Sequence, residues 1–171
     1  MPEVNDSVAV VDYDSAWPDR FAALEGRIRP LLEGICLRVE HIGSTAVPGL
    51  AAKPIIDLDV VVQHASAAEA IRRLATIGYD HEGDLGIPGR EAFRSPAGEP
   101  RHHLYVLEEG SAELRRHIDF RNALRADPTL RDQYAALKRS LARQHRHDRA
   151  AYTRAKSAFI TAALQSRMVP K

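Results

Sequence analysis

The chain has 171 residues, of which 44% are hydrophobic and 27% are charged, a composition that predicts one soluble globular domain and excludes a disordered chain. No apolar run approaches the ~20 residues that a membrane helix needs. The single cysteine, Cys36, excludes an internal disulfide or a multi-cysteine metal cluster. We therefore expect a cytoplasmic protein without a membrane anchor. The net charge of +1 masks a basic stretch at residues 115–156, with twelve Lys and Arg against four Asp and Glu; it would suit a nucleotide or an RNA, although solvated helix faces are the simpler explanation.

The first part of the chain predicts a helix followed by two strands. Apolar residues at helical spacing indicate a helix over residues 18–31, with a proline in its first turn. Alternating residues then predict a strand at 37–42. A loop rich in Gly, Ala and Pro follows at 43–54. Residues 55–62 form the strongest predicted strand, since β-branched residues occur throughout it.

The middle of the chain predicts one more helix and two more strands. Residues 65–77 have helical periodicity and are followed by Gly78, a helix stop. A glycine-rich loop follows at 83–89. Two short strands are predicted at 91–95 and 102–107, joined by a segment rich in turn residues.

The last third of the chain predicts three helices. Apolar residues mark the first helix over 114–124. Asp127 and Pro128 are a cap and first-turn pair for the second helix. Residues 152–159 belong to the third helix. This order predicts an α+β protein of one domain, residues 1–171. A mixed sheet of about five strands would occupy residues 1–110, and the helical half would occupy residues 111–171.

Two acidic residues, Asp57 and Asp59, lie two positions apart in the strongest predicted strand. Residues at this spacing project from one face, about 7 Å apart at Cα, while their apolar neighbours face the core. Adjacent carboxylates repel one another unless a cation lies between them. Hard divalent ions take oxygen ligands of this kind and complete their shell with water and phosphate. The pair therefore predicts a site for Mg²⁺ or Mn²⁺.

A Gly-Ser loop precedes this strand. Gly43 would let a phosphate approach the backbone, and the Ser44 hydroxyl and nearby N–H groups would hold its oxygens. Lys53 and Arg94 are candidates for neutralising phosphate charge. Each part is weak alone, because Gly-Ser pairs are common and Asp-x-Asp can be a solvated strand face. Together and in this order they favour phosphoryl or nucleotidyl transfer.

The spacing of these motifs resembles the nucleotidyltransferase superfamily, and the whole chain resembles the GrpB family. The stretch His-Ile-Gly-Ser-Thr-x-Val-Pro-Gly-Leu at residues 41–50 is highly specific for that family. The resemblance covers nearly all of the chain and rests on residues 14–18, 41–57, 93, 102–104, 108–111, 120–121, 134–138 and 151–156. It implies a nucleotidyltransferase-like fold in which Asp57 and Asp59 are catalytic metal ligands.

One feature departs from the superfamily pattern. The resemblance implies a third carboxylate on a later strand, but the corresponding strand at 102–107 contains no Asp or Glu. His103, which alternates with His102, and Glu108, just past the strand, are the candidates for a third metal ligand. If neither completes the site, the domain would bind a nucleotide without turning it over.

Three further residues are cleft candidates. His41 ends a strand next to the Gly-Ser loop, so it could contact phosphate or stabilise the loop, and the two roles are equally plausible. His117 and Arg121 lie on the first C-terminal helix and could line the cleft, although a solvated helix face is the alternative for His117.

The sequence thus leaves two functions open. The first is transfer of a nucleotidyl group from a nucleoside triphosphate to an unknown acceptor with Mg²⁺ or Mn²⁺, which the intact Gly-Ser and Asp-x-Asp motifs favour. The second is a non-catalytic nucleotide-binding module that regulates or helps to fold a partner enzyme, as implied by GrpB-like domains fused to dephospho-CoA kinase; the missing carboxylate favours it. RNA binding is a third hypothesis that rests on charge alone.

Overall fold

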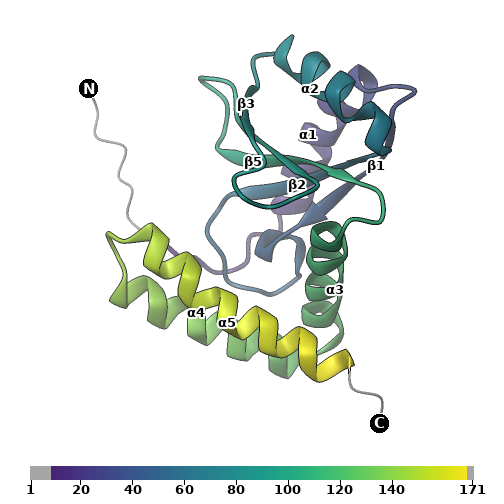
Figure 1. Ribbon diagram of the computed structural model, residues 1–171. Helices are drawn as coiled ribbons and strands as arrows, with labels where there is room; N and C mark the ends of the chain where they lie inside the picture. The colour runs from purple at the N-terminus through teal and green to yellow at the C-terminus, as the bar shows by residue number, and fades with distance from the viewer. Residues whose placement is uncertain (1–8, 169–171) are drawn as a thin grey trace.

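The computed structural model describes residues 9–168, and its centre is one mixed five-stranded sheet (Figure 1). The strands lie in the order β1-β2-β5-β4-β3. β2 and β5 are parallel neighbours, and the other pairs are antiparallel. The mixed α+β sheet expected from the sequence is therefore confirmed. The strands are β1 Cys36–Ile42, β2 Ile56–Val62, β3 Asp80–Gly83, β4 Arg90–Arg94 and β5 His102–Glu108.

Five helices surround the sheet. α1 and α2 lie together at one side of it, while α4 and α5 run next to each other at the opposite side, with α3 between the sheet and this pair (Figure 1). The cap predicted at Asp127 is present, since its side chain accepts a hydrogen bond from the first turn of α4. Ser111 caps α3 in the same way. The helices are α1 Trp17–Leu31, α2 Ala67–Ala75, α3 Ala112–Ala126, α4 Pro128–Gln144 and α5 Arg149–Met168.

The alternation of β2 divides the sheet into an apolar and a polar face. Leu58 and Val60 are fully buried on the apolar face, where they pack with Trp17 and Ile28 of α1 and Leu74 of α2. Asp57 and Asp59 project from the opposite face, as the period of two in a strand requires. The main core thus covers one side of the sheet and leaves the carboxylates toward the C-terminal helices.

A smaller apolar contact fixes α3 on the polar face. Val61 and Leu107, at the ends of β2 and β5, pack against Leu114 near the start of α3. A second cluster joins the segment after β1 to the helices through Val47, Leu50, Leu124 and Tyr134. These contacts hold α3, α4 and α5 opposite the row of polar residues on β2 and β5.

Within residues 9–168, none of the helices has the length and apolar character that crossing a membrane requires.

Candidate functional site

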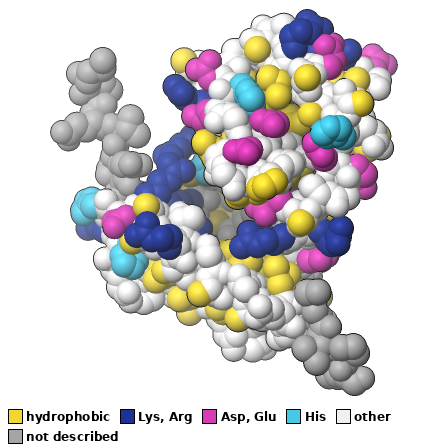
Figure 2. Space-filling model, in the orientation of Figure 1, with side chains coloured by type: hydrophobic (Ala, Val, Ile, Leu, Met, Phe, Trp, Pro, Cys, Tyr) yellow, Lys and Arg dark blue, Asp and Glu magenta, His cyan; other side chains and the backbone are white. Residues whose placement is uncertain are grey.

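A cavity of about 450 Å³ lies between the polar face of the sheet and helices α3, α4 and α5. Figure 2 shows this hollow with Lys and Arg side chains around it. Cations outnumber carboxylates in its lining. The lining cations are Lys53, Lys138, Lys156, Arg90, Arg116, Arg121 and Arg149, and the lining carboxylates are Asp57 and Glu113.

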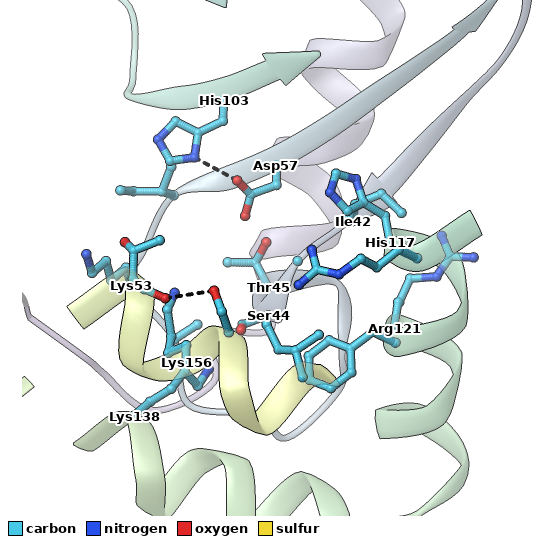
Figure 3. A pocket seen from close by; sticks show the side chains of 18 of the residues that line it. Ile42, Ser44, Thr45, Lys53, Asp57, His103, His117, Arg121, Lys138 and Lys156 are labelled. Carbon is cyan, nitrogen blue, oxygen red and sulfur yellow. Dashed lines mark hydrogen bonds and ion pairs between the residues drawn. The ribbon is translucent and has the colours of Figure 1, made fainter. Parts of the chain in front are cut away.

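Asp57 and His103 form a hydrogen-bonded pair in this cavity (Figure 3). They lie directly opposite each other on the parallel strands β2 and β5, with Asp57 Oδ1 2.7 Å from His103 Nδ1. The other ring nitrogen, Nε2, lies 3.3 Å from Arg149 Nη2. Because a carboxylate only accepts, Nδ1 donates to Asp57, and the carboxylate orients the ring.

Asp59 pairs with a different histidine, His117. The Asp59 side chain is fully buried, and its Oδ2 lies 2.7 Å from His117 Nδ1. The other ring nitrogen, His117 Nε2, lies 3.0 Å from Glu113 Oε1. Burial alone lowers the pKa of His117, but the two carboxylate bonds outweigh it and raise the pKa to about 9. The hydrogen bond from His117 lowers the pKa of Glu113. His117 is thus an imidazolium that lines the cavity in front of Asp59.

The second oxygen of Asp59 is unusual. Oδ1 is buried and has no hydrogen-bond partner among the described residues. Burial raises the pKa of the Asp59 carboxyl, and the hydrogen bond from His117 opposes that shift. An unpartnered buried carboxylate oxygen is costly, so this atom has unused capacity for a ligand.

The Gly-Ser loop approaches Asp57 closely. Gly43 has φ +74° and ψ −172°, a conformation that is essentially restricted to glycine. A Cβ at this position would overlap Asp57 Oδ2 and lie 3.0 Å from Asp57 Cγ. Ser44 and Thr45, next in the loop, also line the cavity. The glycine is therefore required both by the backbone and by the neighbouring carboxylate.

We expect Gly43→Ala to lower the free energy of unfolding by at least about 1–3 kcal/mol, from backbone strain and the clash with Asp57. Gly26→Ala is the matched control, because Gly26 lies in α1 with nothing within 4 Å of an added Cβ. It should stabilise the protein by about 0.5–1 kcal/mol. Urea unfolding of both variants measures the difference, and equal stabilities would contradict this account of the loop.

Three lysines contribute positive charge from the side of α4 and α5. Lys138 is only 2% exposed; its Nζ donates to the Ala51 carbonyl oxygen and lies 4.8 Å from the Tyr134 ring centroid. Lys53 and Lys156 place their Nζ atoms 4.4 and 4.5 Å from the Tyr152 ring centroid. Burial lowers the pKa of Lys138 to about 7 and also lowers that of Lys156.

Sequence reasoning missed Lys138 and Lys156, although a signal for both is present. Tyr134 and Lys138 on α4 are four residues apart, as are Tyr152 and Lys156 on α5, so each pair shares one helix face. The repeated Tyr-x-x-x-Lys pattern marks the faces that meet at the cavity.

Two expected site residues lie elsewhere. Arg94 is exposed on β4, where it pairs with Asp80 and Glu82 of β3, and it does not line the cavity. Glu108 is the last residue of β5, pairs with His64 and lies opposite Val62. Asp57 lies five residues before Val62, so about 16 Å of strand separates Glu108 from it. We therefore correct both assignments.

His41 and Arg121, the remaining cleft candidates, lie on opposite sides of the sheet. His41 points to the α1 side, where it stacks on Phe21 with ring centroids 4.6 Å apart and its Nε2 lies 3.0 Å from Thr45 Oγ1. Burial lowers the pKa of His41 to about 4, so a neutral, loop-stabilising role fits it. Arg121 lines the cavity and bonds to Glu40, a carboxylate on the polar face that sequence reasoning missed, at 2.7 Å.

The fit of a divalent cation is decided by the carboxylates. Asp57 lines the cavity, and Asp59 has the unpartnered oxygen described above. These donors suit Mg²⁺ or Mn²⁺, which prefer carboxylate oxygens and complete their shell with water and phosphate. Within residues 9–168, no group of three or more His, Cys, Asp or Glu is arranged to hold a metal ion. Asp57 therefore faces the cavity as one donor that fits the ion, while Asp59 lies behind His117 with one unpartnered oxygen, and the remaining ligands would come from substrate and solvent.

Sequence comparison finds similar proteins over most of the chain. The pattern of the GrpB protein family matches residues 7–166. The UPF0157 protein YqkA of Bacillus subtilis is 33% identical over 157 residues, which cover 91% of this chain and 46% of YqkA. A dephospho-CoA kinase of Mycolicibacterium paratuberculosis is 28% identical over 179 residues, which cover 90% of this chain and 44% of the kinase. The chain therefore spans less than half the length of both relatives.

Structural comparison gives the same picture. A crystal structure of the conserved protein GrpB from Enterococcus faecalis matches with a TM-score of 0.80 and 34% identity, over 94% of this chain and 100% of that one. The Cid1 poly(U) polymerase, in a structure with Mg and 3'-dATP bound, matches with a TM-score of 0.57 and 16% identity, over 85% of this chain and 49% of Cid1. At this identity the likeness to Cid1 shows a shared, nucleotidyltransferase-like fold.

Proposed function

The chain belongs to the GrpB family, and from that premise and the geometry of its cavity we propose that it binds a nucleoside triphosphate with Mg²⁺ beside Asp57 and transfers its nucleotidyl group to an acceptor. The observation that carries this proposal is the excess of positive charge facing Asp57. Lys138 is almost fully buried, and burial lowers its pKa to about 7, so an anion beside it would favour its charged form. A polyphosphate would supply that anion.

The residues of the cavity suit separate parts of such a substrate. Lys53, Lys138 and Lys156 would hold the phosphates, and Ser44 would donate to one of their oxygens. Mg²⁺, when bound by Asp57 and Asp59 together with the phosphates, would neutralise charge that develops at phosphorus.

In the transfer, an acceptor oxygen would bond to the α-phosphorus, the bond to the β-phosphate would break, and pyrophosphate would leave. The acceptor proton would pass to Nε2 of His103, because Asp57 accepts from Nδ1 and so leaves Nε2 as the ring nitrogen that could take it.

Binding without transfer is the second candidate, and one observation favours it. Asp59 is fully buried behind His117, so only one of the two carboxylates faces the cavity. A module of this kind would bind the same nucleotide and regulate or help to fold a partner enzyme. The kinase relative makes a dephospho-CoA kinase the first partner to test.

Titration with ATP, CTP, GTP and UTP, each with and without Mg²⁺, tests the proposal when pyrophosphate release is followed in parallel. Mg²⁺-dependent binding with slow pyrophosphate release, accelerated by the correct acceptor, is the expected result. Binding without release under any of these conditions would favour the non-catalytic module. No binding of any triphosphate at millimolar concentration would reject the proposed function.

Proton uptake provides a second test of the lysine assignment. At pH 8 Lys138 is mostly neutral, because burial holds its pKa at about 7, and a bound polyphosphate should raise this pKa and protonate it. We expect uptake of up to about one proton on binding of tripolyphosphate at pH 8 and almost none at pH 6. Calorimetry in buffers of different ionisation enthalpy measures it.

The same experiment has a matched pair of variants. Lys138→Met should abolish the uptake at pH 8 and weaken tripolyphosphate binding by about 10-fold or more. Arg143→Met changes an exposed residue of the same helix that does not line the cavity, and it should leave both unchanged. Equal uptake in the wild-type protein and Lys138→Met would show that another group takes the proton.

A further inference from the structure

Two arginines line the cavity away from the lysines. Arg90 begins β4, and its guanidinium lies 4.9 Å from the Tyr105 ring centroid. It makes no ion pair among the described residues; its Nη2 donates to the Asp84 carbonyl oxygen at 3.2 Å, and its Nε is buried without a hydrogen-bond partner. Arg116 of α3 lies 3.7 Å from Glu113. Arg90 is therefore incompletely satisfied within the protein, and Arg116 has one long ion pair.

The two groups of cations lie on different sides of the acidic centre. Lys53, Lys138 and Lys156 lie on one side of Asp57 in Figure 3, and His117 lies on the other. Arg90 and Arg116 belong to the His117 side. Arg90 lies over the Tyr105 ring, whose centroid is 6.3 Å from that of His117, and Arg116 lies beside Glu113, which bonds to His117.

The charges at the arginine side do not balance. His117, Arg90 and Arg116 are positive there, and Asp59 and Glu113 are the carboxylates beside them. Both carboxylates already bind His117, so neither arginine has a carboxylate to itself. A planar guanidinium binds the oxygens of a phosphate group in a bidentate manner. This side of the cavity therefore has the charge and the donors for a second anion.

We propose that Arg90 and Arg116 form a second anion subsite, which holds a phosphate group of the acceptor while the lysines hold the triphosphate. The acceptor would then be a phosphorylated small molecule, bound with its reacting oxygen toward Asp57 and His103. This inference rests on the proposed function, since it assigns the acceptor class of the same site.

Inorganic phosphate is the probe for this subsite. The protein is first saturated with Mg²⁺ and the non-hydrolysable analogue α,β-methylene-ATP, and phosphate is then titrated by calorimetry. We expect phosphate to bind the saturated complex. Arg90→Gln and Arg116→Gln should each weaken phosphate binding by about 10-fold or more, the effect of losing a charged hydrogen bond, and should change the analogue affinity by less than about twofold.

Arg94→Gln is the matched control, because Arg94 lies on the same strand as Arg90 but outside the cavity; it should change neither affinity. Unfolding midpoints verify that each variant is folded, and Arg116, whose side chain is 38% exposed, keeps the test valid if Arg90→Gln does not fold.

The outcomes separate this inference from the function on which it rests. Phosphate that fails to bind the saturated complex, or arginine variants that weaken analogue binding as much as phosphate binding, would overturn the second subsite and leave nucleotide binding intact. Failure of the wild-type protein to bind the analogue would reject the proposed function. Phosphate titrated into the free protein then decides the subsite alone: sensitivity to Arg90→Gln but not to Lys138→Met supports it, and the reverse overturns it.

Discussion

Asp57→Asn should weaken Mg²⁺-dependent binding of a nucleoside triphosphate by at least about 10- to 100-fold, the range seen when even the outer partners of metal ligands are lost. Asp57 is the carboxylate that lines the cavity beside the Gly-Ser loop. Asparagine keeps the side-chain volume and an oxygen that can accept from His103 Nδ1, so we expect the fold to persist. Calorimetry with α,β-methylene-ATP in the presence of Mg²⁺ measures the loss, and thermal unfolding checks the fold.

Without metal, the same variant should gain affinity for a polyphosphate. The negative charge of Asp57 repels a metal-free phosphate in the same cavity. Tripolyphosphate in EDTA should therefore bind Asp57→Asn more tightly than it binds the wild-type protein. Weakening under both conditions would indicate damage to the cavity, and unchanged Mg²⁺-dependent affinity would reject Asp57 as a ligand.

The sequence predicted the parts of the fold that depend on local pattern. The alternation in β2 placed Asp57 and Asp59 on one face because successive side chains of a strand point to opposite sides. The same logic separates His102, which bonds to Tyr79 in the core, from His103. β3 escaped prediction as a strand, because it is an exposed edge strand whose residues Asp80, His81 and Glu82 show no apolar alternation.

The incorrect site predictions concern residues whose positions depend on pairing between strands distant in the sequence. Glu108 looked close to the carboxylates because it follows His103 on the same strand, but only the parallel register of β2 and β5 shows that it lies near Val62. Arg94 has the right charge on a neighbouring strand, yet the acidic residues of β3 hold it. No local pattern contains this information.

The C-terminal helices also show that local pattern does not predict which basic residues are buried. The basic residues of α4 and α5 read as solvated faces in the sequence, and most are exposed. Lys138 differs because the cluster around Tyr134 packs its helix against the Gly-Ser segment through Val47 and Leu50. Its burial follows from tertiary contacts, while the Tyr-x-x-x-Lys spacing only marks the face that can make them.

His117→Ala should lower the free energy of unfolding by about 3–5 kcal/mol, because it leaves Asp59 as an uncompensated buried charge. Asp59 is fully buried, and His117 is its hydrogen-bond partner. His64→Ala is the control, since it removes a histidine–carboxylate pair whose imidazole is 87% exposed; it should cost at most about 1 kcal/mol. Urea unfolding at pH 6 measures both.

The stabilisation by His117 should also depend on pH in a defined direction. Its pKa is about 9 in the folded protein, above the ordinary value of 6.5, so the folded state binds the proton more tightly. The contribution is fully present below pH 6.5 and is lost as the pH rises through 9. Lys138, whose pKa is lowered, has the opposite dependence between about pH 7 and 10.5, so the difference between the wild-type protein and His117→Ala isolates the histidine.

A double variant separates charge from packing at this position. In Asp59→Asn with His117→Ala, no buried carboxylate is left without its cation, so the double variant should be more stable than His117→Ala alone. If the second change instead adds a further loss, the cavity left by the imidazole, and not the charge of Asp59, explains the destabilisation. Rescue, together with a difference between His117→Ala and the double variant that shrinks as the pH falls and Asp59 takes up a proton, would establish that His117 holds the charge of Asp59 when no divalent cation is bound.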